Sequence, residues 1–170
     1  MGKQLKSILL SVALIGFALP GSAAVINLQA NMDGAQANAG AGTGSPGIGL
    51  GTITFDTGSN NLTWSITWSG LVGTPTLMHF HGPALPNQNA GVQVGVGVAG
   101  PPVVGNAVID AQQEADLLAG LWYLNLHTTA VAGGEIRGKV NIVPVPAAAW
   151  LLASGLGLLG WLRRRVSVGG

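Results

Sequence analysis

The chain has 170 residues, of which only 8% are charged and 28 are glycine, and it contains no cysteine. The absence of cysteine excludes disulfide bonds and thiolate chemistry. Five of the seven basic residues lie in the two terminal segments, so residues 24–142 carry two cations against six anions. Binding to a phosphate backbone needs clustered Lys and Arg, so this distribution argues against nucleic acid as a partner.

The N-terminal segment has the pattern of a secretory signal peptide. Lys3 and Lys6 precede an apolar stretch at residues 8–19, which is too short for an ordinary membrane span. Pro20 and Gly21 end that stretch, and small residues at 22–24 suit a cleavage site. We therefore expect residues 1–23 to be a signal peptide and the protein to be exported. A retained N-terminal anchor is the alternative.

Residues 24–142 are predicted to form one all-β domain. Apolar residues occupy alternate positions in four runs, at 62–68, 92–98, 122–126 and 136–142. Turn residues separate these runs at 56–61, 83–91 and 133–134, and the Gly- and Ala-rich residues 34–51 are expected to form a mobile loop that enters a strand. A period of two places one face of a strand in the core and the other near water. Short strands of this kind predict an antiparallel β-sandwich or a partly closed barrel.

The same alternation predicts the core. If the apolar faces point inward, one group of large side chains should be buried together: Trp64, Trp68, Phe80, Trp122 and Leu124.

One short helix is expected within this domain. Asp110 is a suitable N-cap with Gln113 as its capping-box partner, Leu117 and Leu118 can face the core, and Gly120 suits the position after the helix.

Three blocks of this region resemble the CHRD (chordin-type) domain family. They are HFHGPA at 79–84, LLAGLWYLNLHT at 117–128 and GGEIRGKV at 133–140, and the hairpin sequence FDTGSNNLTWSITWSGL precedes them at 55–71. The order and spacing of the blocks also match. The chain departs from the family after Gly34-Ala35-Gln36, where Ala37-Asn38 replaces an acidic residue and prolines. The resemblance implies an immunoglobulin-like sandwich, related to copper-zinc superoxide dismutases, and it names no reaction.

All three histidines of the chain lie in these blocks. His79 and His81 are two residues apart on a predicted strand, so both point to one face, roughly 6.6 Å apart. His127 lies on the polar face of another predicted strand, beside Tyr123 and Asn125. If the two strands are neighbours, the three imidazoles converge.

Neutral imidazoles suit copper or zinc, and three of them leave a coordination position open. The sequence therefore offers His79, His81 and His127 as a candidate metal site. The alternative is structural, with the histidines hydrogen-bonded to loop carbonyls. Even with a metal, three histidines cannot reproduce a bridged copper-zinc pair, so dismutase activity is not expected.

Glu135 and Arg137 form a second polar pair on one predicted strand face. We expect them to pair with each other or with neighbouring strands, at an exposed position where an ion pair stabilises little. The spacing shows neither a Ser-His-Asp triad nor a phosphate-binding loop. The protein is therefore not expected to be an enzyme.

Residues 143–170 resemble the PEP-CTERM sorting tails of Gram-negative bacteria. The string VPVPAAAWLLASGLGLLGWLRRR most resembles the variant that opens with VPLPA, with Val145 in place of Leu. The prolines end the preceding strand, and the apolar residues 147–162 predict a transmembrane helix whose following arginines lie on the cytoplasmic side of the inner membrane. The resemblance implies recognition by a membrane exosortase. A plain tail anchor is the alternative.

Two functions follow from these patterns. The first is an exported, non-enzymatic module of the cell surface or extracellular matrix, with extracellular polysaccharide or matrix as its partner. The second is a surface protein that binds copper or zinc through the three histidines.

Overall fold

The structure is a computed structural model, and it describes residues 23–144. The described chain contains eight strands: β1 (Val25–Asp33), β2 (Ile48–Asp56), β3 (Asn61–Ser69), β4 (Pro75–His81), β5 (Val92–Gly95), β6 (Val103–Val108), β7 (Tyr123–Thr128) and β8 (Ile136–Ile142). Helix α1 (Ala111–Leu118) lies between β6 and β7, and a short 3-10 helix (Asn38–Gly40) lies between β1 and β2.

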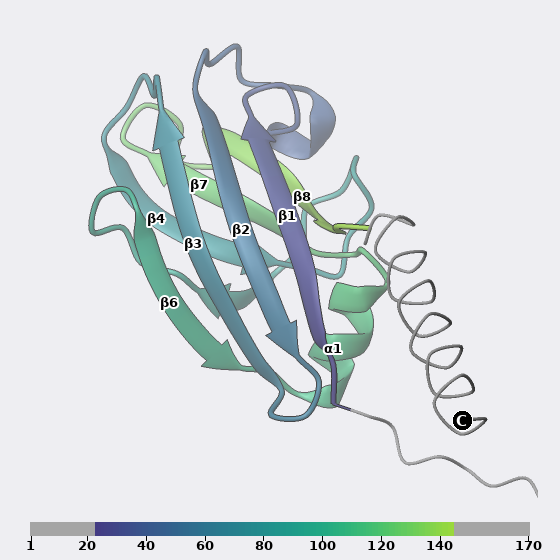
Figure 1. Cartoon of the computed structure of the whole chain (residues 1–170). Coiled ribbons are helices and arrows are strands. Elements are labelled where there is room, and N and C mark those ends of the chain that lie inside the picture. The colour runs from purple at the N-terminus through teal and green to yellow at the C-terminus, as the bar shows by residue number, and fades with distance from the viewer. Residues whose placement is uncertain (1–22, 145–170) are drawn as a thin grey trace, which may run out of the picture.

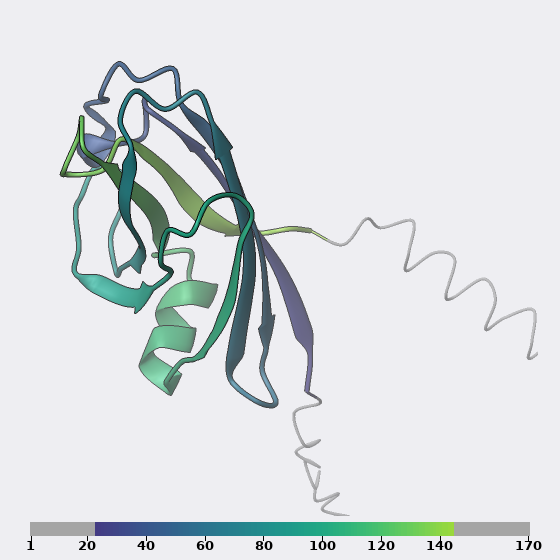
Figure 2. The same ribbon diagram turned by 90° about the vertical axis from the view of Figure 1, so that its left-hand side faces the viewer.

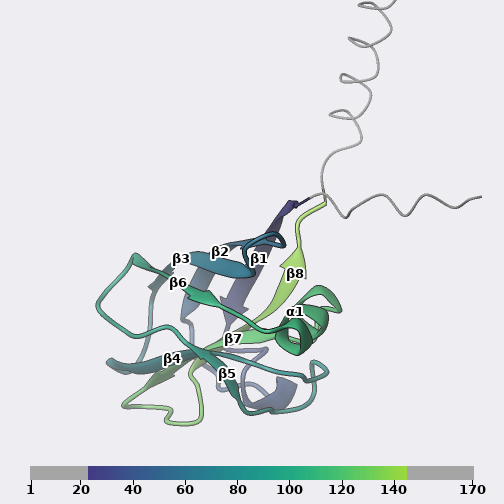
Figure 3. The ribbon, with the colours of Figure 1, turned by 90° about the horizontal axis from the view of Figure 1, so that it is seen from below.

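The strands form one antiparallel sheet in the order β5-β4-β7-β8-β1-β2-β3-β6. The sheet bends so that the layer of β1, β2, β3 and β6 faces the layer of β8, β7, β4 and β5, and α1 covers the lower end between them (Figures 1 and 2). Seen from below, the sheet curls round the core (Figure 3). The end strands β5 and β6 do not pair within residues 23–144, so the barrel is not closed.

This architecture confirms the prediction of an antiparallel all-β domain with one short helix. The two layers face each other as in a sandwich, and hydrogen bonds between β1 and β8 join them along one side as in a barrel. The finer prediction, an immunoglobulin-like topology, stays a prediction.

The core lies between the two layers, and four of the five predicted core residues are buried in it. They are Trp64, Phe80, Trp122 and Leu124, with exposed fractions of 5% or less. Trp68 was predicted to join them, but it is only partly buried. The reason is its place in the sheet, because β6 pairs with β3 only as far as Ile66 and leaves the Trp68 end of the strand uncovered.

Local sequence explains the two best-defined connections. The β2–β3 hairpin turns on Asp56, whose carboxylate accepts the backbone N–H groups of Gly58 and Ser59. Helix α1 begins with the predicted capping box, in which Asp110 accepts from the Gln113 backbone and Gln113 accepts from the Asp110 backbone. Of the two leucines expected to face the core, Leu117 is buried and Leu118 is partly buried.

The strand boundaries differ from the sequence pattern in three places. The expected loop at 34–51 does enter a strand, but that strand, β2, already begins at Ile48. The run at 92–98 forms a strand only as far as Gly95, and Val92 is exposed, because β5 is a short edge strand that pairs irregularly with β4. Strands β1, β2, β4 and β6 lie outside the four runs that the alternation singled out.

The predicted signal peptide at 1–23 and the predicted tail at 143–170 lie almost wholly outside the described residues. Within residues 23–144, no helix is long and apolar enough to cross a membrane.

Candidate metal centre

Strand pairing brings the three histidines together on the outer face of the sheet. Strand β4 lies beside β7, with His79 opposite Asn125, His81 opposite Tyr123, and Leu77 opposite His127. Met78 and Phe80, which alternate with these histidines on β4, point into the core and are fully buried. The alternation therefore places both β4 histidines on the face away from the core, as the sequence predicted.

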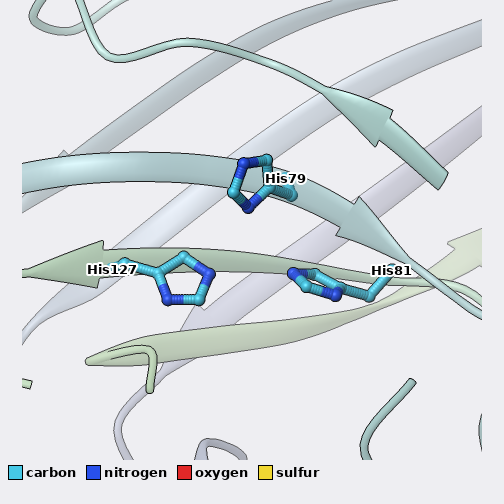
Figure 4. Close-up of side chains that lie close together, drawn as sticks. All are labelled: His79, His81 and His127. Atoms are coloured by element: carbon cyan, nitrogen blue, oxygen red, sulfur yellow. The ribbon is translucent and has the colours of Figure 1, made fainter. Parts of the chain in front are cut away.

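The three rings face a common point (Figure 4). The ring centroid of His79 lies 5.5 Å from that of His81 and 5.4 Å from that of His127. The centroids of His81 and His127 are 5.9 Å apart. One nitrogen of each ring lies within 4.8 Å of a nitrogen on each of the others. The predicted convergence of His79, His81 and His127 is confirmed.

Backbone carbonyls set the protonation of two of these rings. Nδ1 of His81 lies 3.0 Å from the carbonyl oxygen of Ala90, and Nδ1 of His127 lies 2.8 Å from that of Ala132. A carbonyl oxygen only accepts, so both Nδ1 atoms carry the proton. The Nε2 atoms of His81 and His127 therefore keep their lone pairs, in the tautomer that a metal ligand requires.

Two ring nitrogens at this cluster are buried without a hydrogen-bond partner among the described residues, Nε2 of His81 and Nδ1 of His79. Most buried polar atoms in folded proteins do have a partner, so each exception needs a reason. In Figure 4 one nitrogen of His79 points towards the other two rings.

The surroundings favour neutral imidazoles. Burial lowers the pKa of His79, and the nearby His127 lowers it further. Burial also lowers the pKa of His81; the hydrogen bond to Ala90 opposes this, and the positive charges of His79, His127 and Arg137 add to the lowering. The lowered pKa values of His79 and His81 favour the neutral imidazole, which is the form that binds a metal.

The loop before β8 holds His127 in place through Asn125. The Asn125 amide donates to the carbonyl of Gly133 (3.1 Å) and to Nε2 of His127 (3.3 Å), and an ion bound at that nitrogen would displace the second of these bonds. Gly134 leaves room for that amide, since a Cβ at this position would lie 2.2 Å from Asn125 Oδ1 and its φ is +115°. The sequence indicated a turn at 133–134, but it did not indicate that this turn binds the Asn125 amide, which in turn contacts His127.

A stack of planar groups extends from the cluster across the sheet. The Tyr123 ring lies parallel to His81, with ring centroids 5.0 Å apart. The Arg137 guanidinium lies 3.4 Å from the centre of the same Tyr123 ring. Since β7 lies between β4 and β8, Tyr123 separates the imidazole from the guanidinium.

Glu135 and Arg137 were predicted to be exposed, which is wrong, and to pair with each other or with neighbouring strands, of which only contacts to the neighbouring strand β7 are present. Both side chains are buried, with exposed fractions of 0% and 4%, and they do not bond each other. The Glu135 carboxylate accepts four hydrogen bonds instead, from the hydroxyls of Ser45 and Thr128 and the backbone N–H groups of Val72 and Gly73. Three of those donors, in Ser45, Val72 and Gly73, lie 62 to 90 residues away in the sequence, so spacing along β8 could not reveal them.

The residues of this face all lie in the part of the chain that matches a known family. The family model described as the CHRD domain matches residues 28–140, more than half of the chain. The chain belongs to the CHRD domain family. His79, His81 and His127 all lie inside the matched part of this CHRD domain. No curated protein and no solved structure matches the chain.

Proposed function

We propose that this CHRD-domain protein is exported and binds one copper or zinc ion through His79, His81 and His127. The observation that carries the proposal is the convergence of three imidazoles whose ring nitrogens lie within 4.8 Å of one another. Imidazole nitrogen suits copper and zinc, whereas magnesium and calcium prefer oxygen ligands.

The orientation of the rings supports binding beyond simple packing. Two carbonyls hold His81 and His127 so that Nε2 carries the lone pair, which is the arrangement that supports metal-ligating histidines. A purely structural cluster would leave two buried nitrogens without a partner, at a cost in folding free energy. A metal ion would satisfy both.

The cluster fits an ion after a small rearrangement. Three nitrogens at about 2.0–2.1 Å from one tetrahedral metal lie roughly 3.4 Å from each other. In the structure the three ring nitrogens lie within 4.8 Å of one another, so they must move closer together to bind one ion. His79 can make that movement, because its Nδ1 has no partner among the described residues. The other two rings are held at Nδ1 and provide the fixed part of the site, and the Asn125 amide must release Nε2 of His127 when the ion binds.

We assign this domain a binding role and not a catalytic one. Glu135, the carboxylate immediately before β8, already accepts four hydrogen bonds and is not available as a general base. The proposed address is the cell surface or extracellular matrix of a Gram-negative bacterium, reached through the signal peptide and the exosortase-recognised tail. A CHRD domain is consistent with export, since these domains occur in extracellular proteins.

A second candidate is a matrix or polysaccharide-binding module in which the histidines are structural. The observation that favours it is the pair of bonds from His81 and His127 to the carbonyls of Ala90 and Ala132, which tie two loops to the sheet. In that case, replacing His127 would lower stability without any effect on metal content.

Calorimetric titration of the full chain with zinc and with copper, without a polyhistidine tag, separates the two candidates. We expect one ion per chain in the wild type and a large loss of affinity in His127→Ala. Thr67→Ala is the control, because Thr67 is exposed on the opposite layer and its change should leave binding intact. Absence of one-to-one binding in the wild type would reject the metal function and leave the structural module.

A further inference from the structure

A second candidate site lies next to the histidine cluster, beyond the Tyr123 ring as seen from His81. A pocket of about 230 Å³ is lined mainly by apolar groups, among them Ala84, Pro86 and Trp122, and by the cationic side chains of Arg137 and Lys139. Neither the metal proposal nor the CHRD family match gives this pocket a role.

Arg137 is the unusual member of the lining. Its side chain is 96% buried, yet its one hydrogen bond among the described residues runs from Nη1 to the amide oxygen of Asn89, at 3.3 Å. A buried arginine normally has a carboxylate partner, because an uncompensated charge in the interior is costly. The contact with the Tyr123 ring offsets part of that cost but fills none of the N–H donors.

The chain has no carboxylate side chain to spare for Arg137. All six acidic residues lie within the described part of the chain, and none of them pairs with it. Asp33 is its partner in the β1–β8 register, but the Asp33 carboxylate accepts the backbone and side-chain N–H groups of Gln36. Glu135 is held by its own four donors.

A second cation lines the same pocket. Lys139 stands two residues from Arg137 on the same face of β8, so their Cα atoms lie roughly 6.6 Å apart along the strand. Two cationic side chains thus line one mainly apolar space.

We infer that this pocket binds a small carboxylate with an apolar body, with the carboxylate held by Arg137 and Lys139. The guanidinium fork matches a carboxylate in geometry as well as charge. The mainly apolar lining selects against a strongly hydrated anion such as sulfate and against a polyhydroxylated sugar. The volume is below the range of about 300–1,000 Å³ usual for drug-sized ligands, so the occupant is small.

Titration of the full chain with benzoate, benzamide and sulfate, followed by NMR, tests this inference. Benzoate combines a carboxylate with an apolar ring, benzamide keeps the shape without the charge, and sulfate keeps the charge without the apolar body. We expect benzoate to bind about tenfold or more tightly than either, which is the ratio that charge-assisted hydrogen bonds support. Equal binding of benzoate and benzamide, or no binding of benzoate, would overturn the proposal.

Substitutions locate the site. Arg137→Gln should remove the preference for benzoate over benzamide, and Lys139→Gln should weaken benzoate binding by a smaller factor. Because Arg137 is buried and its change can impair folding, Ala84→Leu provides an independent test by filling the pocket. The control is Ala99→Leu, the same change on an exposed loop outside the pocket. Benzoate binding that survives Ala84→Leu would place the ligand elsewhere and refute the inference.

The same titration in the presence of a chelator, and in His127→Ala, separates this site from the metal centre. Benzoate should still bind in both, since none of the pocket-lining groups is a histidine. Binding that appears only with zinc or copper present would mean that the carboxylate coordinates the ion, and the pocket assignment would then be wrong.

Discussion

Replacing Glu135 with glutamine should destabilise the domain by several kcal/mol while leaving the three histidines in place. Burial alone would raise the pKa of Glu135, but the hydrogen bonds from Ser45, Thr128, Val72 and Gly73 lower it from its usual 4.5 to about 2. Since one pKa unit corresponds to about 1.4 kcal/mol, the ionised carboxylate contributes about 3 kcal/mol to folding. That is a large part of the roughly 5–15 kcal/mol by which domains are stable.

The glutamine side chain cannot replace that carboxylate. Both oxygens of Glu135 accept a backbone N–H group, Oε1 from Val72 at 2.6 Å and Oε2 from Gly73 at 3.0 Å. An amide has only one oxygen, so one of these N–H groups must face the amide nitrogen and lose its partner. An unsatisfied buried donor costs about 1–3 kcal/mol, in agreement with the magnitude obtained from the pKa.

Chemical denaturation of wild type and Glu135→Gln as a function of pH provides the assay. Because the folded-state pKa is lowered, the stabilisation by Glu135 is fully present above about pH 4.5 and is lost as the pH falls towards 2. The two proteins should therefore differ by about 3 kcal/mol at pH 7 and converge at low pH. A difference below about 0.5 kcal/mol at pH 7, the size of an ordinary surface change, would refute this account of Glu135.

Three further predictions concern the core and the metal site. Trp122→Ala should cost about 3–5 kcal/mol in a denaturation experiment, because the side chain is 1% exposed and its removal leaves a cavity; an unchanged midpoint would contradict the assigned strand faces. Gly134→Ala should lower zinc affinity about tenfold, since it displaces the turn that orients His127. Gly133→Ala is its matched control, because a Cβ there meets nothing within 4 Å. Metal affinity should fall as pH drops, because protons compete with the ion for the imidazole nitrogens, and the lowered pKa values of His79 and His81 move their part of this competition to lower pH; a pH-independent affinity would exclude imidazole ligands.

The histidine cluster could be predicted because it depends on two simple facts. The period of two fixes the side of the strand from which His79 and His81 project, and the β4–β7 pairing adds His127. The alternation supplied the first fact, but the second was a condition that the spacing could not decide. The chain between β4 and β7 passes through β5, β6 and α1, and no local pattern says which strand it returns to.

Other features of the site escaped prediction because their partners are distant in the sequence. Ser45 and Val72 reach Glu135 across 90 and 63 residues. A charged pair two residues apart therefore suggested an exposed ion pair, whereas the fold buries each charge separately. Trp68 was predicted on the correct face of its strand but is only partly buried. Alternation predicts the face from which a side chain projects, but it does not predict whether another strand covers that face.

The central claim is that three imidazoles bind one ion through particular nitrogens, and long-range ¹H–¹⁵N correlation of the histidine rings tests it most directly. Without metal, His81 and His127 should both show the tautomer with the proton on Nδ1, because Ala90 and Ala132 accept from it. On addition of one equivalent of zinc, the Nε2 resonances of these two rings and one nitrogen of His79 should shift together, and the two Nδ1 protons should remain. Ring resonances that do not change with zinc, or a shift confined to one ring, would contradict the claim.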